Sequence, residues 1–451
     1  MNFMMAFGWA SIMLCLGVFL RAKVPFLRNI LAPASVVGGV LGFILVNVCS
    51  GLNLNLGTDT EMYTSIVNNL FTISFISISL TKPASKEKNN SKNFLQGMVA
   101  LGLIWCFLYA LPPIIATGLI KILGKDQNMD AIYGMLIPFA FCQGPGQAAA
   151  YGEIFEQYGW EKASVVAITF ATIGFVAAFA VGIPVAKAGI KKGIVRHCKK
   201  IDDRILKGYL KKEEQTEYMV RDTNCNSNVE TLAFHFALIG GCYILAVGIS
   251  KILSFIPGFL GTSMSSMMFM NGMYAAYIVR WLMGKLNIDF LQDNVLQSKI
   301  TGWTSDYLVV CSFMAISINL VSQWVVPILT VSLAVTIVTF LVCFYLGARI
   351  GGDNDFERTL GLYGICTGTV PSGISLIRIV DLDFETATSA EIGACNTVML
   401  ASTPVYIIIL AVASGSLPMN YAIMCLIICA GIYLGVLKVA RLWGQKTYDW
   451  K

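Results

Sequence analysis

Two stretches rich in glycine and proline interrupt the apolar sequence, and they decide the predicted fold. The first reads Phe141-Cys142-Gln143-Gly144-Pro145-Gly146-Gln147-Ala148-Ala149-Ala150, and the second reads Tyr363-Gly364-Ile365-Cys366-Thr367-Gly368-Thr369-Val370-Pro371-Ser372-Gly373. Glycine and proline break helices and free backbone groups that hydrocarbon cannot satisfy. At membrane depth such backbone survives only against protein or a water-filled cavity. Each stretch is therefore a candidate re-entrant hairpin, and a kinked span is the alternative.

The composition places the rest of the chain in a lipid bilayer. Of 451 residues, 56% are hydrophobic and only 13% are charged, whereas about 25% of an average soluble chain is charged. The 13 cysteines form no CxxC pair and there are two histidines, which disfavours a redox subunit or a metalloprotease. Apolar stretches long enough to cross fall at 3–20, 30–49, 64–81, 94–121, 163–189, 231–254, 258–283, 301–320, 326–348, 388–413 and 420–440.

The positions of the basic residues predict the topology. Eleven Lys and Arg residues crowd 187–221 among acidic residues, a pattern typical of a solvated cytoplasmic linker and not of a nucleic-acid patch. The basic residues at 21–28 follow the first apolar stretch, so the N-terminus is predicted outside. The linker then lies inside only if 131–150 turns back instead of crossing. Basic residues at 438–446 leave the C-terminus inside.

Self-comparison indicates an internal repeat. The stretch 64–80 aligns with 304–320, and Cys142 and Gly144 match Cys366 and Gly368 at an offset of 224. Each copy holds five spans and one hairpin, and an odd number of spans inverts the second copy. We therefore predict an all-α integral membrane protein with two inverted five-span repeats, each with a re-entrant hairpin, plus an extra C-terminal span.

The repeat divides the chain into four predicted blocks. The first repeat occupies 1–190, with its hairpin near 131–160, and the basic cytoplasmic linker occupies 191–230. The second repeat occupies 231–415, with its hairpin near 359–383, and 416–451 holds the extra span and a cytoplasmic tail.

Inverted repeats with discontinuous helices are typical of secondary transporters, whose sites lie where the broken helices meet. Freed N–H groups and the positive end of a helix dipole attract carboxylates, while freed carbonyls suit Na⁺. The candidate substrate-binding residues are Gln143, Gly144, Gly146, Gln147, Thr367, Gly368, Thr369, Pro371, Ser372 and Asn396. The candidate Na⁺ ligands are Ser77, Ser317, Asp306 and Thr172.

Several polar residues allow two interpretations. Ser77 and Ser317 could line the path or bond across helices. Asp306 and Glu391 lie near the starts of their spans, where each could coordinate a cation or face interfacial water. Arg378 could pair with a substrate carboxylate or anchor the chain at the interface.

The hairpin motifs resemble those of bacterial sodium/glutamate symporters. The stretch 144–152 is similar to the family's Gly-His-Gly-Thr-Ala-Ala-Ala with an aromatic residue and a glycine after it. The stretch 364–372 is similar to Gly-Phe-Gly-Leu-Gly-Ala-Thr-Pro-Thr, and 33–39 is similar to Pro-x-x-Val-x-Gly-Gly. The resemblance carries the family's hairpin glycines onto Gly144, Gly146 and Gly368, and its proline onto Pro371.

The resemblance implies Na⁺-coupled uptake of glutamate or a related anionic amino acid by alternating access, in a homodimer of the bacterial plasma membrane. Na⁺ would be the coupling ion, with no organic cofactor and no nucleic-acid partner. The chain departs from the family at Pro145, Gln147 and Val370, where His, Thr and Thr are usual. Na⁺-coupled transport of a di- or tricarboxylate is therefore the alternative, and a passive channel a more distant one. No nucleophile and base pair indicates an enzyme.

Overall fold

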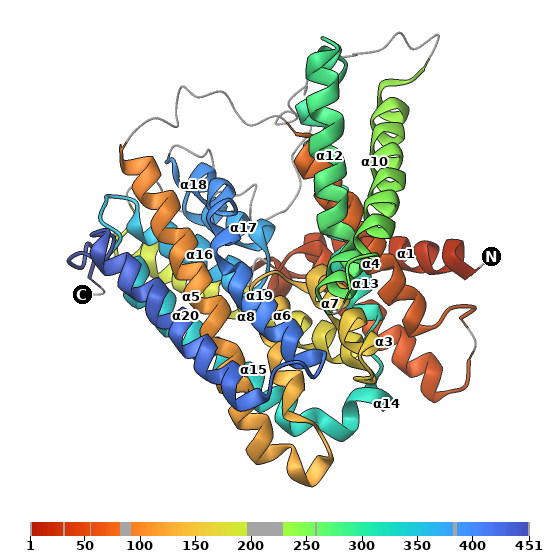
Figure 1. Ribbon diagram of the computed structural model, residues 1–451, viewed down its shortest axis with the longest axis horizontal. Helices are drawn as coiled ribbons and strands as arrows, with labels where there is room; N and C mark the ends of the chain where they lie inside the picture. Colours follow the sequence, from red (N-terminus) through yellow and green to blue (C-terminus); the bar gives the residue numbers. More distant parts are fainter. Residues whose placement is uncertain are drawn as a thin grey trace. The chain divides into compact units, whose positions relative to one another are not determined.

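Every regular element that the structure describes is a helix. The computed structural model describes residues 2–29, 32–54, 56–81, 92–195, 229–257, 259–381 and 386–449, and in these ranges every regular element is a helix (Figure 1). This confirms the predicted all-α class. Most of the basic linker predicted at 191–230 lies outside the described residues.

Nine helical stretches in the described ranges are long and apolar enough to cross a membrane, so the chain is a multi-pass membrane protein. They correspond to nine of the eleven predicted spans. They are α1 (Asn2–Lys23), α3 (Ala34–Gly51), α4 (Thr60–Leu80), α5 (Lys92–Leu123), α8 (Ala163–Lys191), α10 (Thr231–Leu253), α15 (Val325–Gly347), α20 (Met419–Val439) and the stretch formed by α18 (Thr388–Cys395), η6 (Val398–Ser402) and α19 (Thr403–Ala413).

The other two predicted spans are not single helices. The span at 258–283 breaks at Met267, between α11 (Phe259–Ser266) and α12 (Met268–Lys285). The span at 301–320 begins earlier, as α13 (Asn294–Met314), because the Asp293 carboxylate accepts a hydrogen bond from the Leu296 N–H at 2.8 Å and caps the helix. It ends before α14 (Ile318–Val321). Predicting each as one continuous span was wrong.

One compact unit comprises Met1–Leu16, Gly38–Ala84 and Leu210–Ala315. Within it α4 packs against α12 and α13, and α10 packs against α12. Its core contains Ile76, Leu80, Ile239, Cys242, Ala246, Ala275, Ala276 and Ile300. Arg280 donates to the Ser79 and Thr81 carbonyls at 3.0 and 3.1 Å, which satisfies acceptors that the end of α4 leaves unpaired.

The other compact unit comprises Gly17–Val37, Ser85–Tyr209 and Ile316–Lys451. It holds the long helices α5 and α8 together with both glycine- and proline-broken segments. The first segment is η2 (Ala131–Leu136), α6 (Ile137–Phe141) and α7 (Pro145–Gln157); the second is α16 (Asp355–Thr367) and α17 (Val370–Val380). The remaining short elements are α2 (Pro25–Asn29), η1 (Lys125–Gln127) and η5 (Ser322–Trp324) here, and η4 (Asp289–Leu291) in the other unit.

Each compact unit takes helices from both predicted repeats. In the first unit α4 packs against α13, which contains most of the stretch predicted to be its repeat partner. In the second unit both broken segments occur together. The compact units are defined by packing, whereas the four predicted blocks are defined by internal repetition. The division into four blocks therefore stays a prediction.

A buried ion cluster ties α16 to α18 within the second unit. Arg358 donates from Nε to Glu391 Oε2 at 2.7 Å and from Nη2 to Oε1 at 2.5 Å, and its Nη1 lies 3.0 Å from Asp355 Oδ1. Burial raises the pKa of the Asp355 carboxyl, and its donors Gly351, Thr447 and Arg358 offset only part of that rise. Glu391 is 1% exposed. The expectation that Glu391 faces interfacial water was wrong, because its carboxylate is buried and binds Arg358, which lies 33 residues away in the sequence.

Replacing Glu391 with glutamine should destabilise the protein by about 3 kcal/mol, because it leaves the Arg358 guanidinium buried with one carboxylate fewer. The thermal midpoint of the detergent-solubilised protein measures the effect. Lys446→Gln is the matched control, since it breaks a Lys446–Asp449 pair whose side chains are 41% and 62% exposed and which contributes little. Equal midpoints for the two variants would contradict the role given to Glu391.

Candidate functional site

The second broken segment folds back on itself. A Cβ added to Gly364 would lie 2.7 Å from the Gly373 Cα, and one added to Gly361 would lie 2.7 Å from the Ile377 Cδ1. The residues of α16 therefore meet those of α17 in antiparallel order, and the two ribbons lie side by side in Figure 1. The chain reverses at Gly368 and Thr369, and glycines let the two helices approach closely.

The first broken segment also folds back. The ring of Phe139 in α6 stacks on the ring of Tyr151 in α7, with centroids 3.6 Å apart and an interplanar angle of 8°. In one continuous helix residues twelve apart would be separated by roughly 18 Å. The reversal occurs at Gly144, whose φ of 83° lies in the region that favours glycine.

The two turns meet each other inside the second unit. A Cβ on Gly144 would collide with the Thr369 Cγ2 and would lie 3.0 Å from the Gly368 carbonyl oxygen. The Cys142 thiol donates to the Cys366 carbonyl at 3.7 Å. Helix α8 passes beside this contact, since a Cβ on Gly174 would lie 2.7 Å from the Thr367 oxygen. We call this meeting of the 142–146 and 366–372 turns the crossing.

Two helices begin at the crossing. Helix α7 starts at Pro145 and α17 at Val370. The N–H groups of a first helical turn have no acceptor within their own helix, and they form the positive end of the helix dipole. Thr369 N donates to the Ser372 hydroxyl at 3.2 Å, and the two hydroxyls of these residues lie 3.1 Å apart. The crossing therefore combines two positive helix ends with hydroxyl groups, which suits an anion.

Two helices also end at the crossing. The indole of Trp105 donates to the Cys142 carbonyl at 3.1 Å and so satisfies one acceptor at the end of α6. The Thr367 hydroxyl donates to the Tyr363 carbonyl at 2.7 Å. The last carbonyl oxygens of α16, among them those of Thr367 and Gly368, accept no hydrogen bond from an N–H of their own helix. Such carbonyl oxygens are the ligands that transporters use for Na⁺.

Aromatic residues hold the Gln147 side chain. The Tyr109 hydroxyl donates to Gln147 Oε1 at 2.5 Å, and Gln147 is 3% exposed. The ring centroid of Tyr406 lies 4.9 Å from that of Tyr109 and 5.8 Å from that of Tyr151. Because Gln147 occupies the first turn of α7, these rings from α5 and α19 fix where that turn lies.

The structure brings nine of the ten candidate substrate residues to the crossing or to the first turn of its helices. Gln143 and Thr369 are half-buried, Ser372 is buried and Pro371 is exposed. The tenth, Asn396, is exposed where the helix breaks between α18 and η6.

The four candidate Na⁺ ligands are divided between the units. Ser77 and Asp306 belong to the first unit, where the Ser77 hydroxyl donates to the side chain or carbonyl of Gln297 and Asp306 is exposed. Thr172 and Ser317 belong to the second. The Thr172 hydroxyl is buried in α8 without a hydrogen-bond partner, and Ser317 precedes α14. In the described ranges no three His, Cys, Asp or Glu side chains cluster to hold a metal.

Sequence reasoning missed Trp105, Tyr109, Tyr406 and Gly174. The first two lie inside an apolar run that reads only as a span. A buried tyrosine or tryptophan needs a hydrogen-bond partner for its polar atom. The presence of Trp105 and Tyr109 within a predicted span was therefore the sequence feature that could have indicated a polar site. Their partners lie 37 and 38 residues away, and the run itself does not reveal them.

Paired broken helices in a multi-pass membrane protein are typical of secondary transporters. The family model described as sodium/glutamate symporter matches residues 1–384, and the chain belongs to that family. Over 186 residues it is 28% identical to proteins named sodium/glutamate symporter from Escherichia coli (strain K12) and Shigella flexneri. That match covers 40% of this chain and 43% of each relative, so the chain spans less than half the length of these curated relatives. The predicted membership of the sodium/glutamate symporter family is therefore confirmed.

Gly144→Ala should destabilise the protein by roughly 1–3 kcal/mol beyond the cost of placing alanine at a positive φ, because the new Cβ collides with Thr369. Gly159→Ala is the matched control, since Gly159 has a φ of 92° and nothing within 4 Å of an added Cβ. The thermal midpoint in detergent separates them. The double variant Gly144→Ala/Thr369→Ser removes the Cγ2 and should recover part of the loss; no recovery would argue against the contact.

Tyr109→Phe should lower Na⁺-dependent uptake by reconstituted protein about tenfold, since a buried amide oxygen left unpaired costs about 1–3 kcal/mol. Tyr433→Phe is the control. It also removes a tyrosine hydrogen bond, the one of 2.8 Å to the Ala401 carbonyl, but away from Gln147. If both variants lose uptake equally per folded molecule, the Tyr109–Gln147 bond has no special part in the site.

Proposed function

We propose that this protein takes up glutamate, or a closely related anionic amino acid, in symport with Na⁺ by alternating access. The meeting of two helix N-termini at Gly144 and Thr369 carries the proposal, together with family membership. Neither observation requires covalent chemistry, and both fit a carrier that binds and releases its cargo unchanged.

The substrate carboxylates bind at the starts of α7 and α17. The N–H groups of Gly146 and Gln147 offer donors at the positive end of α7. In α17 the Ser372 N–H already donates to the Thr369 side chain in a capping box, so this helix contributes its positive end and its hydroxyls. Thr369 and Ser372 add hydroxyls that lie 3.1 Å apart. Gln143, Gly144, Gly368 and Pro371 shape the turns, and small residues let the ligand approach the backbone.

Na⁺ binds at oxygen atoms at the ends of α6 and α16. The Thr367 carbonyl lies against α8 at Gly174, and the same helix carries the unpartnered Thr172 hydroxyl. A cation beside the bound carboxylates lowers their mutual repulsion. It also offsets part of the hydration energy that the carboxylates lose when they leave water. Substrate and ion then each bind better when the other is present, and this coupling is reciprocal.

Both broken segments enter the membrane and return, from opposite faces, in two inverted five-span repeats. Their support is that residues matched by the offset of 224, Cys142 with Cys366 and Gly144 with Gly368, lie together at the crossing. The charge distribution supports an N-terminus outside and a C-terminus inside the plasma membrane of a bacterium, and we propose a homodimer by analogy with the family.

A second cargo is favoured by one observation. Gln147 stands where the family has Thr, and its side chain is engaged by Tyr109, so the first turn of α7 is built differently in this chain. Na⁺-coupled uptake of a di- or tricarboxylate is the corresponding alternative.

Uptake of radiolabelled glutamate into proteoliposomes tests the proposal. We expect accumulation under an inward Na⁺ gradient and none when K⁺ or choline replaces Na⁺, with empty liposomes as the control. Uptake that follows a proton gradient alone, or runs only down the glutamate gradient, would overturn Na⁺ coupling. If a dicarboxylate, and not glutamate, accumulates with Na⁺, the coupling stands and the cargo is the alternative one.

A further inference from the structure

The chain crosses the base of the second hairpin after its last span. Beyond α20, residues 444–448 contact the end of α15 and the start of α16, and we call this segment the C-terminal strap. Gly444 N donates to the Arg349 carbonyl at 2.7 Å, and Thr447 N donates to the Ala348 carbonyl at 2.9 Å. The end of α15 leaves such carbonyls without an acceptor role inside the helix, so the strap satisfies them.

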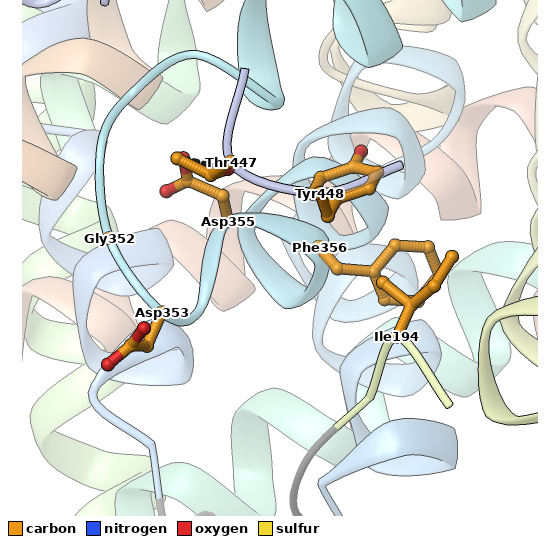
Figure 2. A pocket seen from close by; sticks show the side chains of 7 residues that line it. All are labelled: Ile194, Gly352, Asp353, Asp355, Phe356, Thr447 and Tyr448. Carbon is orange, nitrogen blue, oxygen red and sulfur yellow. Dashed lines mark hydrogen bonds between the residues drawn. The ribbon is translucent and has the colours of Figure 1, made fainter. Parts of the chain in front are cut away.

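The strap also binds side chains of α16. The Thr447 hydroxyl lies 2.8 Å from Asp355 Oδ2 and 3.0 Å from the Ala348 carbonyl, so these two acceptors share its one proton, and the Tyr448 hydroxyl donates to the Thr359 Oγ1 at 3.2 Å. The ring of Tyr448 meets the ring of Phe356 edge to face, with centroids 5.4 Å apart. Figure 2 shows Thr447 beside Asp355 and Tyr448 beside Phe356, around a cavity of about 290 Å³.

Asp355 connects the strap to the buried ion cluster. One of its oxygens accepts from Thr447 and the other from Arg358, whose guanidinium binds Glu391 in α18. The base of α16 is therefore held by charged and hydroxyl groups from three separate parts of the chain. The other end of α16 carries the Gly368 turn at the crossing.

We propose that the C-terminal strap is a positioning element for the second hairpin, with Thr447 as the positioning residue. The proposal rests on the proposed function of the crossing. Helix α16 has 13 residues and is about 20 Å long, so a tilt of about 3° at its base moves the Gly368 turn by about 1 Å. Thr447 itself is exposed, so its contact with a buried carboxylate orients α16 without filling the core.

Transport kinetics in proteoliposomes test the strap. Thr447→Val keeps the shape of the side chain and removes the donor; it should raise KM for glutamate about three- to tenfold, as loss of one charge-assisted hydrogen bond does, with the maximal rate per folded molecule within about twofold. Thr447→Ser should restore the wild-type KM. Lys446→Gln, one residue earlier and facing Asp449, is the control and should leave KM unchanged.

Hydrogen–deuterium exchange provides a readout that needs no substrate. In Thr447→Val the peptides covering 351–359 and 364–372 should exchange faster, whereas Lys446→Gln should match the wild type. A role limited to stability would lower the thermal midpoint and leave both KM and exchange at 364–372 unchanged, and that result would overturn the proposal. If the wild type shows no Na⁺-driven glutamate uptake, the proposed function fails, and exchange at 364–372 alone decides on the strap.

Discussion

The requirement that every backbone polar group in a membrane protein finds a partner governs this structure. Two helices break at the same place, and each break would be costly if it faced lipid. The breaks instead meet each other, with Cys142 donating to the Cys366 carbonyl and Trp105 donating to the Cys142 carbonyl. Gly144 and Gly174 are glycines because any Cβ there would collide with the opposite turn.

Formal charge and partial charge are separated along the second hairpin. The base of α16 carries Asp355, Glu357 and Arg358 and meets Glu391, and within this group Arg358 pairs with both Asp355 and Glu391. The turn at its other end carries no charged side chain between Tyr363 and Ser375, and there the helix ends supply partial charges instead. A ligand at the crossing therefore meets helix-end partial charges that no neighbouring ion pair compensates. The ion pairs at the base of α16 hold the hairpin in place.

Sequence patterns predicted the spans better than the breaks within them. Nine of eleven predicted spans are confirmed by length and apolarity. The prediction of a continuous span was wrong for 258–283 and 301–320. An apolar run does not reveal a helix cap such as Asp293 or a break such as the one at Met267. The glycine- and proline-rich turns were found because these residues act on the backbone locally. Glu391 was misread because its partner Arg358 lies 33 residues away.

By itself, the sequence determined the membrane class, the places where two helices break and the family. Composition, local backbone chemistry and short motifs express these properties within a few residues. Only the tertiary structure decided that Gly144 meets Thr369, that Tyr109 holds Gln147 and that the strap binds Asp355. Each of these contacts joins residues 38 to 225 positions apart, and such pairings depend on how whole helices pack, which no local pattern encodes.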